Sequence, residues 1–147
     1  MTRGYGGSGA KYAGVVTEDM VEQFGDEACM LAMHHPASIV VAARRKKDGL
    51  KLLEKTGVDY AIIDDGYQTL GIAKDLTYLL VDGRHPFENG HCLPAGPLRE
   101  KDVSRAQVVV VTHADGMTLQ EQAKLRARLK HPCVVWGKHA FAGLFCP

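Results

Sequence analysis

Short apolar runs alternate with longer amphipathic segments along the chain, and this pattern predicts the elements of secondary structure. The apolar runs show no period-two alternation, which is typical of strands covered on both faces of a parallel sheet. The predicted strands cover residues 38–43, 60–63, 76–81, 108–111 and 133–136. The runs at residues 60–63 and 76–81 are each followed by an acid and a glycine, and we expect the carboxyl end of the first to carry the chemistry.

The amphipathic segments predict helices over residues 17–35, 48–55 and 118–130. Gly25 divides the first helix into two pieces, and Asp26 is placed to cap the second, because its side-chain oxygen can accept from the free N–H groups there. A basic run, residues 44–47, follows the first predicted strand and is expected to be a solvated helix start. Because strands and helices alternate throughout, the predicted fold class is α/β with a mainly parallel sheet.

The length, composition and net charge of the chain argue against some classes of protein. The 147 residues lie within the usual range for one domain that buries a sizeable core. Hydrophobic residues make up 46% and charged residues 24%, which is ordinary for a soluble globular protein and argues against disorder. The net charge of +1 gives no support to nucleic-acid binding as the main function, because that requires a strongly basic surface.

The cysteines and the apolar runs indicate in which cellular compartment the protein works. The four cysteines include no C-x-x-C pair, so the sequence indicates neither a zinc site nor a disulfide framework, and a reducing cytosol suits it. No apolar run approaches the roughly 18 to 20 residues of a membrane span, and the first residues lack the apolar core of a signal peptide. A lipid partner is still compatible with such a chain.

The run that ends in Asp64 and Asp65 carries the clearest chemistry. In open α/β sheets, ligands bind in the crevice beyond the carboxyl ends of the strands. Two adjacent acids at that edge suit Mg2+ with bound phosphates, because Mg2+ takes oxygen ligands and keeps several waters. The alternative is that Asp-Asp-Gly is simply a turn that stops a strand. These residues alone leave both interpretations open.

The first residues of the chain form a glycine-rich segment, with four glycines among residues 2–9. Glycines let a backbone approach a ligand closely, and Arg3 and Tyr5 add a charge that can pair with phosphate and a polar-tipped ring. The segment is not a P-loop, since the G-x-x-x-x-G-K-[ST] pattern occurs nowhere in the 147 residues. The alternative interpretation is an unstructured terminus.

A long aperiodic stretch, residues 84–100, contains several prolines and glycines. Loops of this length are uncommon in compact domains and are more often functional than incidental. Pro94 and Pro97 stiffen the stretch around Ala95-Gly96, which predicts a shaped loop that presents Arg99. A simple spacer is the alternative. Asp26 likewise has two interpretations, a helix cap or a general base held at a helix start.

Taken together, the motifs resemble those of the tetraacyldisaccharide 4'-kinases, the lipid A 4'-kinases of Gram-negative bacteria. The resemblance rests on Arg3-Gly4-Tyr5-Gly6-Gly7, Gly25-Asp26-Glu27, Asp64-Asp65-Gly66-Tyr67-Gln68, Asn89-Gly90, Leu93-Pro94-Ala95-Gly96-Pro97-Leu98-Arg99-Glu100 and Ala114-Asp115. It implies a three-layer, P-loop-NTPase-like fold and a transfer of phosphate from ATP to the 4'-hydroxyl of a tetraacyl disaccharide 1-phosphate. It also implies peripheral association with the cytoplasmic face of the inner membrane and a lipid disaccharide as substrate. Neither the resemblance nor the residues predict an oligomeric state.

The resemblance assigns the cofactor-binding residues. Asp64 and Asp65 match the acidic pair that handles Mg2+ in this family, and Gln68 matches the amide just beyond it. ATP and Mg2+ are therefore the implied cofactors.

The resemblance also assigns catalytic and substrate residues. Asp26 matches the aspartate that acts as general base toward the sugar hydroxyl, with Glu27 beside it. Arg99 matches an arginine that can neutralise phosphate charge. Arg3 and Tyr5 match the segment that faces the disaccharide. These roles suit phosphoryl transfer, which needs positioning, metal charge and a base within reach of the attacking hydroxyl.

The chain departs from the family in extent. The family's phosphate loop precedes the Arg-Gly-Tyr-Gly-Gly segment, and the family continues past Pro147 into a smaller second domain with a histidine that partners the catalytic aspartate. His113 and Thr69 stand where the family usually has asparagine and histidine. We therefore expect residues 1–147 to be a partial kinase core domain that lacks the P-loop strand and a second domain, and that has little activity alone.

Two other classes of function compete with the kinase. One is a non-catalytic remnant, or a module of the same fold that binds Mg2+ or anions. The other is an unrelated α/β phosphohydrolase that uses Asp64 and Asp65.

Overall fold

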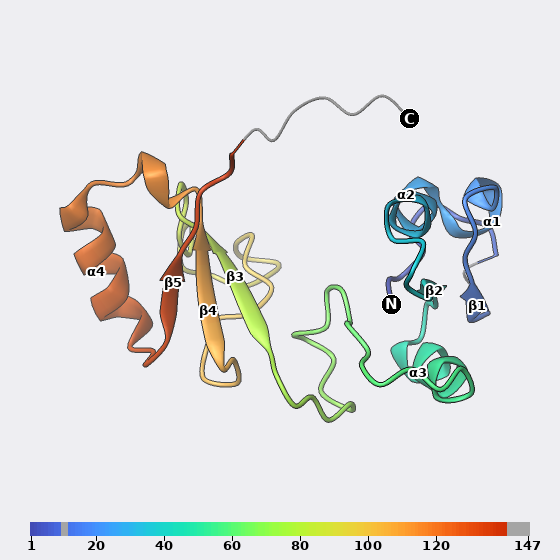
Figure 1. The fold of residues 1–147 in the computed structure, drawn as a ribbon. Coiled ribbons are helices and arrows are strands. Elements are labelled where there is room, and N and C mark those ends of the chain that lie inside the picture. Colours follow the sequence, from blue (N-terminus) through green and yellow to red (C-terminus); the bar gives the residue numbers. More distant parts are fainter. Residues whose placement is uncertain (10–11, 141–147) are drawn as a thin grey trace. The chain divides into compact units, whose positions relative to one another are not determined.

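A computed structural model describes residues 1–9 and 12–140 of the chain. The chain divides into two compact units, Met1–Ile72 and Ala73–Pro147, called unit 1 and unit 2 below (Figure 1). Each unit combines helices with parallel backbone pairing, and each is described separately.

The described residues of unit 1 form three helices and one short antiparallel strand pair. The helices are α1 (Val21–Phe24), α2 (Asp26–His34) and α3 (Lys46–Glu54), and the strands are β1 (Gly14–Val15) and β2 (Val41–Ala42). The predicted break at Gly25 is confirmed, because α1 ends and α2 begins on either side of it. The strand predicted over residues 38–43 is confirmed only at β2. Its partner β1 was not predicted, since two residues are too few to show a period.

The start of the chain adds parallel pairing to unit 1. The Thr2 N–H donates to the Val41 carbonyl at 2.9 Å, and the Ala43 N–H donates to the Thr2 carbonyl at 3.1 Å. On the other side, the Met1 nitrogen donates to the Ile62 carbonyl at 2.7 Å, and the Asp64 N–H donates to the Met1 carbonyl at 3.0 Å. This alternation is that of parallel strands. Segments 41–43, 1–2 and 62–64 therefore run side by side in the same direction.

The core of unit 1 joins the helix pair to β2. Its buried members are Val16, Phe24, Ala28, Cys29, Val40 and Ala42. Met20, Leu31 and Ala32 pack against them. Because Phe24 ends α1 and Ala28 lies in the first turn of α2, this core holds the α1–α2 junction in place.

The predicted strand over residues 60–63 is wrong as a buried strand. No strand is assigned there, and the side chains of Tyr60 and Ile62 are 90% and 84% exposed. The described residues of unit 1 pack nothing over these two side chains, and only Met1 pairs with the backbone. The apolar run therefore lacks the covering layers that its pattern predicted.

Residues 73–140, the described part of unit 2, form a three-stranded parallel sheet with one α-helix against it. The strands β3 (Tyr78–Asp82), β4 (Val108–Thr112) and β5 (Val134–Trp136) lie in the order β3-β4-β5. A 3-10 turn, η1 (Ala114–Gly116), and the helix α4 (Leu119–Leu129) connect β4 to β5. The predictions for these three strands and this helix are confirmed, apart from shifts at their ends.

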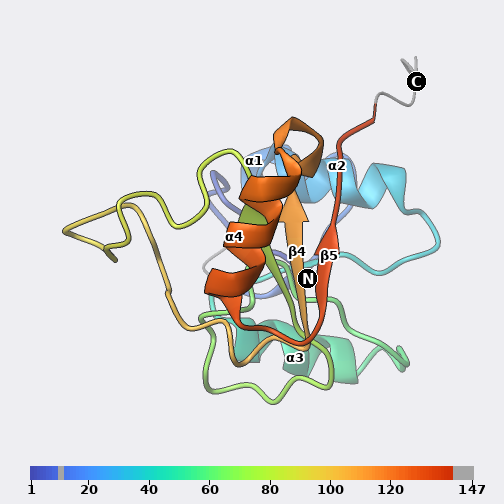
Figure 2. The same cartoon turned by 90° about the vertical axis from the view of Figure 1, so that its left-hand side faces the viewer.

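One face of this sheet is covered by α4, which Figures 1 and 2 show lying along it. Val109 and Val111 of β4 are completely buried, and Leu125 and Leu129 are the buried residues of α4. On the opposite face, register places Leu80, Val110 and Val135 together, and Leu80 and Val135 are 66% and 47% exposed. The described residues of unit 2 thus form two layers, and the α/β class with a parallel sheet is confirmed.

Candidate functional site

The parallel segments of unit 1 end at one edge, and several candidate residues follow directly from those ends. Arg3 follows segment 1–2, and Lys46 comes shortly after segment 41–43. Asp64 ends segment 62–64, and Asp65 follows it. The Lys46 ammonium donates to the backbone carbonyl of Asp64. This edge, the carboxyl edge of unit 1, therefore combines two carboxylates with two cations.

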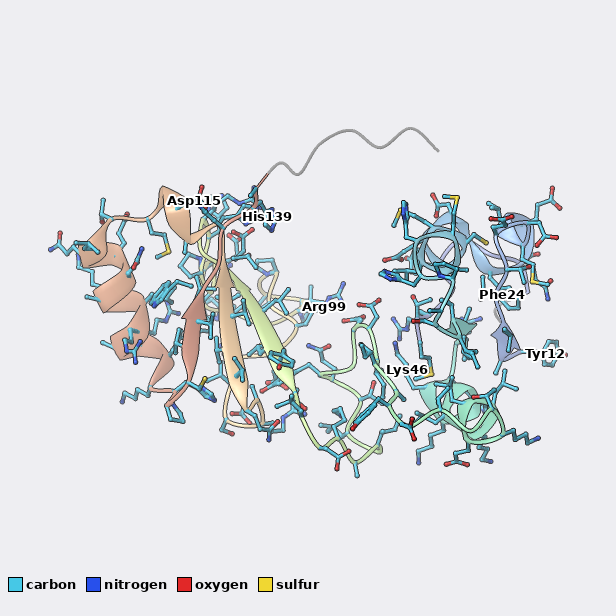
Figure 3. All side chains as sticks on the ribbon, viewed as in Figure 1. Tyr12, Phe24, Lys46, Arg99, Asp115 and His139 are labelled. Atoms are coloured by element: carbon cyan, nitrogen blue, oxygen red, sulfur yellow. The ribbon has the colours of Figure 1, made fainter. Side chains whose placement is uncertain are left out.

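Lys46 is the residue of this edge that the sequence analysis missed. Only 7% of it is exposed, whereas Arg44, Arg45 and Lys47 are exposed, so the expectation of a solvated basic run is wrong for Lys46 alone. Figure 3 labels it at the start of α3. Burial lowers the pKa of Lys46, the charges of Asp64 and Asp65 oppose that effect, and Arg3 adds to it. Its position just beyond a strand's carboxyl end is shared with Arg44 and Arg45, so the sequence held no signal that separates Lys46 from them.

Asp64 and Asp65 lie in a turn at the end of their segment, and both are exposed. Asp65 has a φ of +48°, a left-handed conformation that aspartate tolerates better than most residues. Asp64 and Asp65 therefore form a turn, and this turn still leaves both carboxylates exposed to a ligand. Tyr67 is buried, which anchors the segment, and Gln68 next to it is exposed.

The carboxyl edge of unit 1 offers only a few protein oxygens as ligands for a metal ion. Within residues 1–9 and 12–140, no group of three or more His, Cys, Asp or Glu side chains could hold a metal ion. Two neighbouring carboxylates nevertheless suit Mg2+, which is usually held by one or two carboxylates, several waters and phosphate oxygens.

The glycine-rich segment packs on the α1–α2 junction. The Ser8 N–H donates to the Glu22 carbonyl at 2.9 Å, and the Gly9 N–H donates to the Gln23 carbonyl at 2.8 Å. A Cβ at Gly7 would lie 2.6 Å from the Phe24 Cα, so only glycine fits there. The interpretation of an unstructured terminus is therefore wrong for these residues.

Gly25 links this segment to Asp26. It precedes α2 with a φ of +85°, and a Cβ on it would overlap the Tyr5 carbonyl. Gly25 thus occupies the N-cap position that was predicted for Asp26, because only glycine combines this φ with so close an approach. Asp26 is the first residue of α2, and its carboxylate accepts from the Glu27 N–H at 2.8 Å.

The Tyr5–Gly25 contact brings two sets of predicted residues together. Tyr5, which is 80% exposed, and the exposed acids Asp26 and Glu27 lie on either side of it. The arrangement presents a polar ring and two carboxylates to solvent beside a helix start, where a carboxylate is electrostatically favoured.

Arg99 lies in unit 2, unlike the other seven predicted residues, on the long loop between β3 and β4 (Figure 3). The loop has internal order, as predicted: the His91 N–H donates to the Asn89 side-chain oxygen at 3.0 Å, and the Leu93 N–H donates to the Leu98 carbonyl at 2.9 Å. The spacer interpretation does not account for these bonds.

Glu100, the residue after Arg99, is held in place by several contacts. The Glu100 carboxylate accepts from the Asp102 and Lys101 N–H groups at 3.1 and 3.0 Å and pairs with Arg105 at 2.7 Å. The bonds from the Asp102 and Lys101 N–H groups, with the Arg105 charge, lower the pKa of Glu100. Arg99 itself is exposed, so the loop presents it beside a fixed carboxylate.

A second charged cluster lies at the carboxyl ends of β3, β4 and β5. Arg84 pairs with Asp82 at 2.7 Å and holds the pKa of that carboxyl well below its usual range. His113 lies 3.5 Å from Asp82, and its ring centroid is 4.1 Å from that of His139. The sequence analysis noted the acid that ends β3 but did not predict the cluster, because its members are far apart in the chain.

Comparison with known proteins gives a consistent result. The sequence profile of a family described as "Tetraacyldisaccharide-1-P 4'-kinase" matches residues 1–142. Proteins named "Tetraacyldisaccharide 4'-kinase" are also similar. That of Paramagnetospirillum magneticum is 38% identical over 84% of this chain and 38% of its own length. That of Tolumonas auensis is 32% identical over 100% of this chain and 48% of its own length.

These comparisons also show how much of its relatives' length the chain covers. The chain spans less than half the length of these two curated relatives. No solved structure matches it. Among the helices that the structure describes, none is long and apolar enough to cross a membrane.

Proposed function

Because the chain belongs to the tetraacyldisaccharide 4'-kinase family, we propose that it is part of an enzyme that phosphorylates the 4'-hydroxyl of a tetraacyl disaccharide 1-phosphate. ATP is the phosphate donor, and the product belongs to lipid A biosynthesis. The observation that carries the proposal is the family match over residues 1–142, which includes every candidate residue of both units. The carboxyl edge of unit 1 supports it, since its charges suit a metal–phosphate ligand.

Asp64 and Asp65 would hold Mg2+ at this edge, with the amide of Gln68 beside them. Bound Mg2+ neutralises charge on the transferring phosphate. The ammonium of Lys46 supports this site in two ways. It holds the Asp64 carbonyl, and hence the turn that carries both carboxylates, and it adds positive charge where phosphate oxygens would lie.

The acceptor sugar binds at the Tyr5–Gly25 contact. Asp26, held at the start of α2, accepts the proton of the attacking 4'-hydroxyl on its carboxylate, and Glu27 adds negative charge beside it. Arg3 and Tyr5 bind the disaccharide through its polar groups. Arg99 neutralises phosphate charge during transfer.

In this proposal residues 1–147 form a partial kinase core with a three-layer, P-loop-NTPase-like architecture in the whole enzyme. A phosphate loop supplies backbone N–H groups and a lysine to the donor phosphates in such enzymes, and the 147 residues contain no G-x-x-x-x-G-K-[ST] pattern. The enzyme works at the cytoplasmic face of the inner membrane, where its lipid substrate is accessible to a peripheral protein.

Phosphate transfer from MgATP to the tetraacyl disaccharide 1-phosphate tests the proposal directly. The assay compares the 147-residue chain with a form extended at both ends to the length of its relatives, and mass spectrometry identifies the bisphosphorylated product. We expect product from the extended form and little or none from the chain alone. An extended form that folds but transfers no phosphate would contradict the proposal and favour a non-catalytic remnant.

A further inference from the structure

A cavity of about 760 Å³ lies in unit 2, at the end of the sheet where β4 and β5 begin. It is therefore at the opposite end from Asp82 and His113, and no role proposed above uses it. Its walls are largely apolar. They include Phe87, Leu98, Val103, Ala106 and Leu129.

The charged residues that line this cavity are mainly cationic. Lys101, Arg128 and Lys130 line it, and Asp102 is the one acidic residue in the lining. The Asp102 carboxylate already accepts from the Ser104 N–H at 2.8 Å and lies 3.9 Å from the Arg105 guanidinium. The three cations therefore leave the cavity with excess positive charge, which favours an anionic ligand.

Arg128 is held in place before any ligand binds. Its guanidinium carbon lies 4.5 Å from the centroid of the Phe87 ring, a cation–π contact. Phe87 has a φ of +63°, which is rare and strained for a bulky side chain. Strain of this kind is found where a site requires it, and here it accompanies a ring that supports a cation at the cavity.

Besides ligand binding, the dipole of α4 can account for cations near its carboxyl end, because a positive charge is favourable there. Arg126 and Arg128 both lie in the last turn of α4 and are both exposed, but only Arg128 lines the cavity. Arg126 is thus a control of the same residue type, on the same turn, with the same relation to the dipole.

From the apolar walls, the three cations of the lining and the contact that holds Arg128, we propose that this cavity binds a phosphate monoester that carries an apolar group. The phosphate pairs with Arg128, Lys101 and Lys130, and the apolar group lies against Leu98, Val103 and Leu129. An amphiphilic lipid phosphate and a soluble alkyl phosphate share this chemistry.

Nuclear magnetic resonance titration of the 147-residue chain tests the proposal without any kinase activity. The probes are hexyl phosphate, inorganic phosphate and hexanol, and the readout is the shift of the Gly90 and Lys130 amides. We expect saturable shifts with hexyl phosphate and roughly tenfold or more weaker binding of either other probe, because each lacks one half of the ligand. Short-chain phosphatidic acid then distinguishes a lipid from a soluble phosphate: tighter binding than hexyl phosphate assigns the cavity to a lipid.

Arg128→Gln and Arg126→Gln are the matched variants. We expect Arg128→Gln to weaken hexyl phosphate binding roughly tenfold and Arg126→Gln to leave it nearly unchanged. Lys101→Gln provides a second variant if Arg128→Gln alters the free spectrum. Equal losses in the Arg126 and Arg128 variants, equal binding of inorganic phosphate and hexyl phosphate, or no saturable shift would each overturn the proposal.

Discussion

At the scale of residues, the position of Asp26 depends on the glycine before it. Gly25 adopts a φ of +85° against the Tyr5 backbone, so Asp26 follows it as the first residue of α2 and is exposed. A carboxylate that served only as a helix cap would be expected at the N-cap position itself, which Gly25 occupies. This arrangement is consistent with a base that meets an acceptor hydroxyl.

The Asp26→Asn change tests that role in the extended protein. Asparagine keeps the size of the side chain and can still accept from the Glu27 N–H, but it cannot take a proton from the hydroxyl. We expect turnover to fall by about 100-fold or more, with ATP affinity nearly unchanged. Glu22→Gln, a change at another exposed acid of unit 1, serves as the control. Turnover that survives Asp26→Asn would leave the residue with a structural role.

Lys46 leads to a prediction about pH and stability. Burial lowers its folded pKa below the usual 10.5, so between those two values the unfolded chain binds more protons than the folded one. Stability should therefore rise with pH in that window, and the penalty for the buried charge should be fully present below it.

Urea unfolding between pH 7 and pH 10.5 measures this effect as a difference between variants. The rise in the unfolding midpoint should be smaller in Lys46→Met than in the wild type. Lys47→Met, which removes an exposed neighbour, should retain the full rise. Identical slopes for all three proteins would show that Lys46 is not held as a buried cation.

At the scale of elements, the α1–α2 junction is defined by backbone contact, and two glycines of unit 1 allow a comparison. Gly25 and Gly57 both have positive φ, at +85° and +72°, but a Cβ on Gly25 would overlap the Tyr5 carbonyl, whereas one on Gly57 has nothing within 4 Å. Gly25→Ala should therefore cost about 1 to 3 kcal/mol more than Gly57→Ala, because it adds overpacking to the same backbone strain. Chemical denaturation measures both, and equal losses would mean that Tyr5 does not pack on the junction.

Periodicity predicted the elements that have enough residues to show it. The helices α3 and α4, the break at Gly25 and the strands of unit 2 follow their sequence patterns to within a few residues. The run at residues 60–63 failed because its pattern specifies burial, which depends on what packs over it. Lys46 could not be distinguished from Arg44 and Arg45 for the same reason, since one lysine among four cations carries no local sign of burial.

At the scale of the whole molecule, motif order was more informative than any single element. The resemblance to the 4'-kinases rested on short motifs spread over both units, and the family match over residues 1–142 confirms it. The cavity of unit 2 and the Asp82–His113 cluster were beyond prediction, because each is assembled from residues that are distant in sequence. The same motif order assigns Asp64 and Asp65 to Mg2+.

The dependence of phosphate transfer on Mg2+ tests that assignment most directly. In the extended protein, Asp65→Asn should raise the Mg2+ concentration required for half-maximal activity by roughly tenfold or more, because one oxygen ligand loses its charge. Asp59→Asn, at an exposed acid before the same segment, should leave the requirement unchanged. An unaltered requirement in Asp65→Asn would contradict the account and reduce Asp64 and Asp65 to a turn.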